Sequence, residues 1–130
     1  MNTTDDEFTT ANDFLARVAA ALDECAIDQR AASAMPHRTD AENVARCARL
    51  ALVCARTSAW WGLLARRAYH FPYAHGALFG KAAMNAQLTE WDRAKFWRES
   101  AADWQARAEQ RPTSDAAGAL SNWAELGVTA

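Results

Sequence analysis

Two adjacent apolar stripes between residues 44 and 68 constrain the fold of this chain more than any other feature. One stripe recurs at steps of three and four residues and comprises Val44, Cys47, Ala51, Cys54, Ser58, Trp61, Ala65 and Ala68. The second runs beside it and comprises Leu50, Val53, Thr57, Trp60 and Leu64. Such spacing marks faces of an α-helix. A helix with two apolar faces needs a neighbour on each side, as in a helical bundle.

The composition also favours helices over strands. Alanine supplies 32 of the 130 residues, whereas Val and Ile together supply only five. Alanine has the highest helix propensity, and β-branched residues are the ones that fill the pleated surface of a sheet. A chain of this length is typical of one domain. The sequence therefore predicts a single all-α domain over residues 1–130.

Prolines and capping patterns divide the chain into helices. Pro36, Pro72 and Pro112 mark loops, because proline lacks the amide donor that a helix interior requires. Three pairs resemble capping boxes, namely Thr10/Asp13, Thr39/Glu42 and Thr89/Asp92. We expect helices over residues 11–34, 40–69, 73–88 and 90–110. The sequence therefore predicts that these helices form an antiparallel up-down four-helix bundle. A flexible acidic tail (1–9) precedes the bundle, and a C-terminal extension (111–130) with a short helix over 115–126 follows it.

Further spacing patterns predict which faces point inward. The first helix carries a stripe of Leu15, Val18, Leu22, Cys25, Gln29 and Ala32. The last helix carries Ala94, Trp97, Ala101, Trp104 and Ala108. In the helix expected over residues 73–88, the residues expected to face the core are His75, Phe79, Ala82 and Ala86. Gly76 and Gly80 would allow close backbone approach at this point.

The charge balance and the apolar runs exclude several partners. The chain has 14 basic and 16 acidic residues, so it offers no strongly basic face for nucleic acid. The longest apolar run, residues 59–65, is shorter than the roughly 20 residues that span a membrane. The N-terminus lacks the pattern of a secretion signal. We expect a cytoplasmic protein with reduced thiols and with no membrane or nucleic-acid partner.

All three cysteines fall on inward stripes. Cys25 and Cys47 are equally distant from Pro36, so they can face each other across an antiparallel hairpin. Cys54 lies about 10.5 Å further along the helix than Cys47, at 1.5 Å per residue, so those two cannot bind one ion together. The alternative is that all three are small buried apolar residues, which free cysteines often are.

One segment carries a family resemblance. The run Ala45-Arg-Cys-Ala-Arg-Leu-Ala-Leu-Val-Cys-Ala55 resembles the second helix of the cysteine-rich four-helix-bundle copper-storage proteins, and Asp23-Glu-Cys-Ala26 is weakly similar to their first helix. Such proteins bind Cu(I) with many interior thiolates. The resemblance implies that Cys25, Cys47 and Cys54 occupy metal-ligand positions.

Other positions depart from the pattern of that family. Ser58 and Ser100 stand where a cysteine is expected, and bulky rings occupy the space for copper at Trp61, Trp97 and Trp104. The resemblance therefore implies a divergent member that has lost bulk copper storage. Such a member keeps either a small metal site or only the scaffold.

An aromatic, histidine-rich loop follows the second helix, Tyr69-His-Phe-Pro-Tyr-Ala-His75. Imidazole is a common metal ligand and general base. The predicted ligand-binding residues are Tyr69, His70, Tyr73, His75 and, from the adjacent helix, Trp61. The alternative interpretation is a rigid turn whose rings cover the end of the core.

These observations leave three classes of function. The first is a metal-handling, copper-type or small-ligand-binding bundle. The second is a helical protein-interaction module, with self-association among its modes, that uses Trp60 or Trp61 if either is exposed. The third is a small enzyme with an aromatic and histidine pocket, although the chain has no Glu-x-x-His, His-Glu-x-x-His or Cys-x-x-Cys motif.

Overall fold

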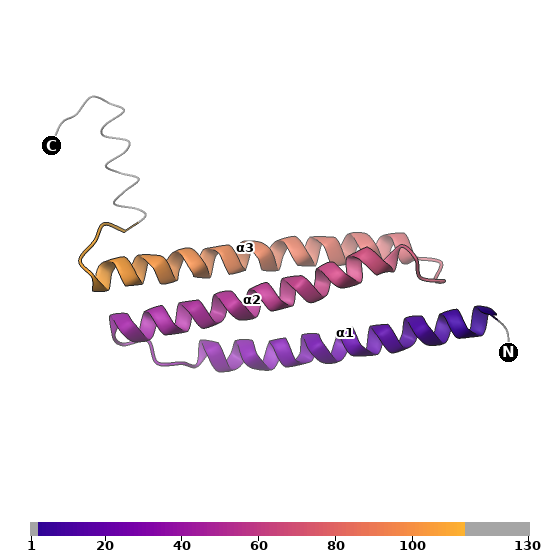
Figure 1. The fold of residues 1–130 in the computed structure, drawn as a ribbon, viewed down its shortest axis with the longest axis horizontal. Coiled ribbons are helices and arrows are strands. Elements are labelled where there is room, and N and C mark those ends of the chain that lie inside the picture. The colour runs from indigo at the N-terminus through magenta and orange to yellow at the C-terminus, as the bar shows by residue number, and fades with distance from the viewer. Residues whose placement is uncertain (1–2, 114–130) are drawn as a thin grey trace, which may run out of the picture.

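The computed structural model describes residues 3–113, which form three long α-helices (Figure 1). They are α1 (Thr3–Ser33), α2 (Asp40–Ala68) and α3 (Gly76–Ala108). Figure 1 shows α2 lying between α1 and α3, with short loops that reverse the chain direction. α2 packs extensively against α3 and less extensively against α1, whereas α1 and α3 barely touch. The all-α prediction is confirmed, as is a neighbour on each side of α2.

The predicted break near residue 89 is wrong. The expected helices over 73–88 and 90–110 are one continuous helix, α3. The Thr89 Oγ1 donates a hydrogen bond to the Asn85 carbonyl one turn back at 3.0 Å, so this threonine sits inside the helix and caps nothing. The described part of the chain therefore contains three helices in place of four. The short helix expected over 115–126 lies outside the described residues.

The predicted acidic tail is also wrong over residues 3–9. α1 begins at Thr3, and the proposed cap residue Thr10 lies inside the helix. The first turn contains Asp5 and Asp6, whose negative charges are favourable at the positive end of the helix dipole. α1 therefore begins about two turns earlier in the sequence than expected, and these two turns form one wall of a cleft described below.

The ends of the helices are set by local hydrogen bonds. The Thr39 side chain accepts from the Glu42 amide at 3.1 Å, and the Glu42 carboxylate accepts from the Thr39 amide at 3.1 Å, which confirms the predicted capping box. At the end of α3, Gln110 adopts a left-handed φ of 57°. Its amide bonds to the Arg107 carbonyl, and the Arg111 amide bonds to the Ala106 carbonyl. This Schellman pattern ends α3 just before Pro112.

The core lies where α1 and α3 pack against α2. Its buried residues are Phe14 and Val18 of α1, Leu64 and Ala65 of α2, and Ala83 of α3. Partly buried side chains surround them, namely Leu15, Leu22, Trp60, Trp61, Leu63 and Phe71. Large rings thus pack around small alanines.

The predicted inward face at the start of α3 is wrong for three of its four residues. His75, Phe79 and Ala82 are exposed and Ala86 is only partly buried. Gly76, Gly80 and Ala83 are buried in their place. A Cβ at Gly76 would lie 2.7 Å from the Ala68 carbonyl oxygen, and a Cβ at Gly80 would lie 2.7 Å from the Tyr69 ring. The glycines therefore let α3 lie directly against the end of α2, as their sequence suggested.

No helix within residues 3–113 combines the length and the hydropathy that crossing a bilayer requires.

Candidate functional site

The three cysteines are buried free thiols on two helices. Cys25 lies on α1, whereas Cys47 and Cys54 lie on α2. Burial raises the pKa of the Cys47 thiol, with a smaller opposing effect of Arg46. Burial also raises the pKa of Cys54, and the neighbouring Glu90 carboxylate adds to that rise. Because the thiolate is the form that binds metals, both shifts favour the non-binding thiol.

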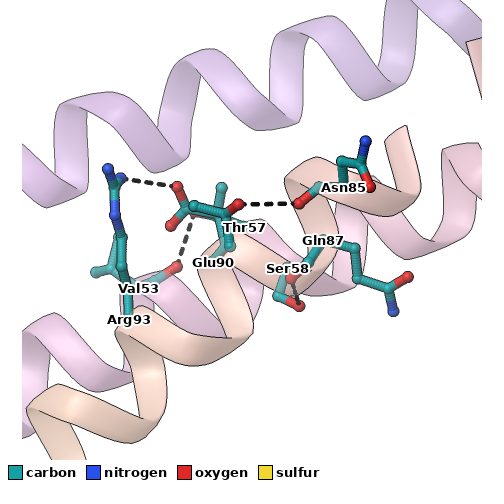
Figure 2. A network of polar contacts seen from close by, with 8 residues as sticks. Val53, Thr57, Ser58, Asn85, Gln87, Glu90 and Arg93 are labelled. Atoms are coloured by element: carbon teal, nitrogen blue, oxygen red, sulfur yellow. Dashed lines mark hydrogen bonds and ion pairs between the residues drawn. The ribbon is translucent and has the colours of Figure 1, made fainter. Parts of the chain in front are cut away.

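The Cys54 thiol of α2 lies beside the Glu90 carboxylate of α3, which takes part in an ion pair within α3. Figure 2 shows Glu90 paired with Arg93, whose Nη1 lies 3.0 Å from the Glu90 Oε1. The Glu90 Oε2 is buried and receives no nitrogen or oxygen donor among the described residues. Nearby, the Ser58 hydroxyl donates to the Gln87 carbonyl at 3.0 Å. Within residues 3–113, no group of three or more His, Cys, Asp or Glu side chains is arranged to hold a metal ion.

The histidine-rich loop is fastened to α1 through its aromatic rings. Phe71 packs edge-on against Phe14 at 5.8 Å and against Tyr73 at 6.0 Å, and Tyr73 packs against Phe8 at 5.6 Å between ring centroids. The Tyr73 hydroxyl also donates to the Asn12 side-chain oxygen. These contacts hold the loop over one end of the core.

The structure distributes the five predicted ligand-binding residues over different places. Tyr69 and His75 are exposed, and His75 is the cap residue at the start of α3. Trp61 packs against the core from α2. Tyr73 lines a small apolar hollow of about 130 Å³. His70 is the one member that lines the larger cleft.

That larger cleft lies between the start of α1 and the end of α2, and we call it the N-terminal cleft. Its volume is about 500 Å³. One face of α1 lines it with Thr3, Asp6, Glu7, Thr10, Ala11 and Phe14. The other lining residues come from the end of α2 and the loop that follows it, namely Arg67, His70, Phe71 and Pro72. The volume is within the range of small-molecule sites.

A second candidate surface lies on α3. Of the nine large apolar residues that are exposed in the described part of the chain, six belong to this helix. Met84, Leu88 and Trp91 are 46%, 56% and 51% exposed and follow one another at steps of four and three. Lys81 and Lys95 continue the same spacing at either end, and both are exposed. We call these five residues the α3 stripe.

The α3 stripe has the spacing of a coiled-coil contact. Trp60 and Trp61, on which the interaction hypothesis rested, are both partly buried against the core. Among the tryptophans within residues 3–113, the exposed one is Trp91. The sequence contains the signal for the stripe, at steps of three and four from residue 81 to residue 95. The expected helix break at Thr89 divided that signal between two helices.

Comparisons of the chain with protein-family models, with curated proteins and with solved structures gave no significant match.

Proposed function

We propose that this protein is a helical interaction module that self-associates, with the α3 stripe of one copy packing against the α3 stripe of a second. The exposed apolar face of α3 carries the proposal. Three large apolar side chains in helical register, bounded by lysines, form a contiguous contact strip on a helix that is covered by α2 on another face. Exposed apolar patches with charged edges are typical of protein interfaces.

The spacing of the stripe favours a second copy as the occupant. In an antiparallel helix pair, each a position packs beside a d position of its partner. A two-fold axis midway between Met84 and Leu88 places Met84 of each copy against Leu88 of the other. The same operation places Lys81 against Trp91. A two-fold interface needs such self-complementarity, because each contact occurs twice.

The charges beside the stripe fit the same arrangement. Lys81 would lie over the face of the partner's Trp91, a favourable cation–π geometry. It would also lie next to the partner's Asp92, which is exposed and directly follows Trp91. Within one copy, Lys81 and Asp92 are eleven residues apart, or about 16 Å, so their attraction operates between copies.

The length of the stripe sets the strength of the association. In the proposed register the paired residues run from Lys81 to Trp91, about 15 Å of helix at 1.5 Å per residue. A contact of this length is at the small end of protein interfaces, and such interfaces are typically weak and reversible. We therefore expect a monomer–dimer equilibrium that shifts with protein concentration.

A matched pair of substitutions tests this proposal. Leu88→Glu places a charge in the middle of the stripe, whereas Ile27→Glu places the same charge on α1 at nearly identical exposure, 57% against 56%. Sedimentation equilibrium should give a concentration-dependent dimer for the wild type and for Ile27→Glu, and a monomer for Leu88→Glu. A wild type that stays monomeric, or equal behaviour of the two variants, would contradict the proposal.

A charge exchange tests the register. Lys81→Glu and Asp92→Lys should each weaken the dimer, because each brings like charges together across the interface. The double variant restores opposite charges and should recover the wild-type association. Additive weakening in the double variant would rule out the proposed pairing.

A further inference from the structure

The N-terminal cleft has an apolar floor and two walls of opposite charge. Its floor includes Phe14 and Ala11, both 5% exposed, and the rings of Phe71 and Pro72. An apolar floor of this kind gains binding free energy from covering a flat hydrocarbon group. The site is independent of the α3 stripe, which lies on a different helix.

The charged groups stand on opposite sides of that floor. The α1 wall presents the carboxylates of Asp6 and Glu7. The opposite wall presents the guanidinium of Arg67, from α2, and the imidazole of His70, from the loop that follows α2. The Arg67 guanidinium carbon lies 4.5 Å from the centroid of the Phe14 ring, so the stacking contact holds this charge at the edge of the floor.

The two walls do not neutralise each other directly. Among the ion pairs of residues 3–113, none joins Arg67 to Asp6 or Glu7. The cleft therefore offers carboxylates that can bind a positively charged group on one side and a guanidinium that can bind a negatively charged group on the other. An apolar surface lies between them. A molecule that carries both charges and an apolar body matches all three elements.

We propose that the N-terminal cleft binds a small zwitterion with an aromatic or branched apolar side chain, a free amino acid being the simplest form. The ammonium group lies toward Asp6 and Glu7, and the carboxylate lies toward Arg67. The side chain lies on Phe71 and Pro72.

Three probes of the same ring system separate these contributions. L-phenylalanine carries both charges, 2-phenylethylamine lacks the carboxylate, and 3-phenylpropionate lacks the ammonium. Isothermal titration should show that L-phenylalanine binds about tenfold more tightly than either analogue, the lower end of the effect of a hydrogen bond to a charged group. Chemical-shift changes in the NMR spectrum should centre on Phe14 and Phe71.

Charge-removing variants then assign each wall. Arg67→Gln should bind L-phenylalanine and 2-phenylethylamine equally, because it has lost the carboxylate partner. The double variant Asp6→Asn, Glu7→Gln should bind L-phenylalanine and 3-phenylpropionate equally. Arg66→Gln removes a neighbouring exposed arginine that does not line the cleft and should keep the full preference.

Three results would overturn the inference. The first is the absence of saturable binding of L-phenylalanine up to about 10 mM, weaker than the millimolar range expected for small polar ligands. The second is equal affinity of the wild type for all three probes. The third is a preference that survives in both wall variants. All substituted residues are exposed, and circular dichroism verifies that the variants remain folded.

Discussion

Two glycine-to-alanine substitutions should change stability in opposite directions, although the added methyl groups meet their neighbours at nearly the same distance. A Cβ at Gly62 would lie 2.6 Å from the Gln87 Nε2, and a Cβ at Gly76 would lie 2.7 Å from the Ala68 carbonyl oxygen. The neighbours differ in kind. The Gln87 amide is the end of a flexible side chain and can rotate away, whereas the Ala68 carbonyl is backbone at a fully buried residue.

The magnitudes follow from this difference. Gly62 lies in the interior of α2, where replacing glycine with alanine stabilises a helix by up to about 1 kcal/mol. Gly76 is the first residue of α3, where the gain in helix propensity is smaller. The clash there forces α3 away from α2, and overpacking of this kind costs about 1–3 kcal/mol. We expect Gly62→Ala to raise the free energy of unfolding and Gly76→Ala to lower it.

Urea denaturation followed by circular dichroism measures both changes. The slope of the transition should stay constant, so that the shift in midpoint reports stability alone. The difference in unfolding free energy between the two variants should be about 1–4 kcal/mol, as the sum of the two effects above. A Gly76→Ala protein as stable as the wild type would refute the close contact between the start of α3 and the end of α2.

Four further predictions concern the core and the thiols. Trp97 is half-buried with its ring 5.6 Å from the Arg46 guanidinium, so Trp97→Ala should cost about 1–3 kcal/mol in a urea melt, less than the loss of a fully buried ring. Glu90→Gln should lower the pKa of Cys54, so peptide mapping should detect its alkylation by iodoacetamide at lower pH than in the wild type. Because the folded-state pKa of Cys54 is raised, its ionisation equilibrium contributes to stability below the ordinary thiol pKa of 9.0, and this contribution is lost as the pH rises through the folded-state pKa. Urea melts of the wild type and of Cys54→Ala across this pH range should detect the loss. Titration with Cu(I) against a chelator should give at most one or two tightly bound ions, and the Cys25→Ser, Cys47→Ser variant should lose them. A larger stoichiometry would contradict this ceiling, whereas the absence of tight binding, or binding that survives the substitution, would remove these cysteines as metal ligands.

The sequence predicted the parts of the fold that depend on helical spacing. The two apolar stripes of α2 correctly placed it between two neighbours, and Thr39 correctly marked its start. Both signals are local, because burial of a helix face and satisfaction of the first amides are decided within a few turns. Long periodic segments are for that reason the most predictable part of a helical protein.

Two wrong helix boundaries came from one local sequence pattern that was read without its structural context. A threonine three residues before an acid satisfies helix amides only where the helix begins, and inside a helix the same hydroxyl bonds to the preceding turn, as Thr89 does. The false break at Thr89 divided the α3 stripe, and the false start at Thr10 removed Asp6 and Glu7 from the helix that forms the cleft. Both candidate sites were therefore missed for the same physical reason.

The inward face of early α3 could not be derived from hydrophobicity. Glycine and alanine are buried there because α3 lies against backbone, while Phe79 remains exposed at 51%. The two glycines indicated a close approach of backbones. Which face of α3 meets α2 depends on where the two helices meet in space, and apolar spacing within one helix does not contain that information.

Disulfide crosslinking across the proposed dimer tests the central claim most directly. Met84→Cys and Leu88→Cys are prepared as separate proteins, mixed and mildly oxidised, with Ile27→Cys as the control of equal exposure. The antiparallel α3 pair places residue 84 of one copy level with residue 88 of the other, and a disulfide forms only when the two Cα atoms are about 4.4–6.8 Å apart. The account predicts a reducible dimer that forms far more readily in the mixture than in either protein alone. Crosslinking of each variant mainly with itself would contradict the antiparallel register, and crosslinking no greater than that of Ile27→Cys would contradict association through α3.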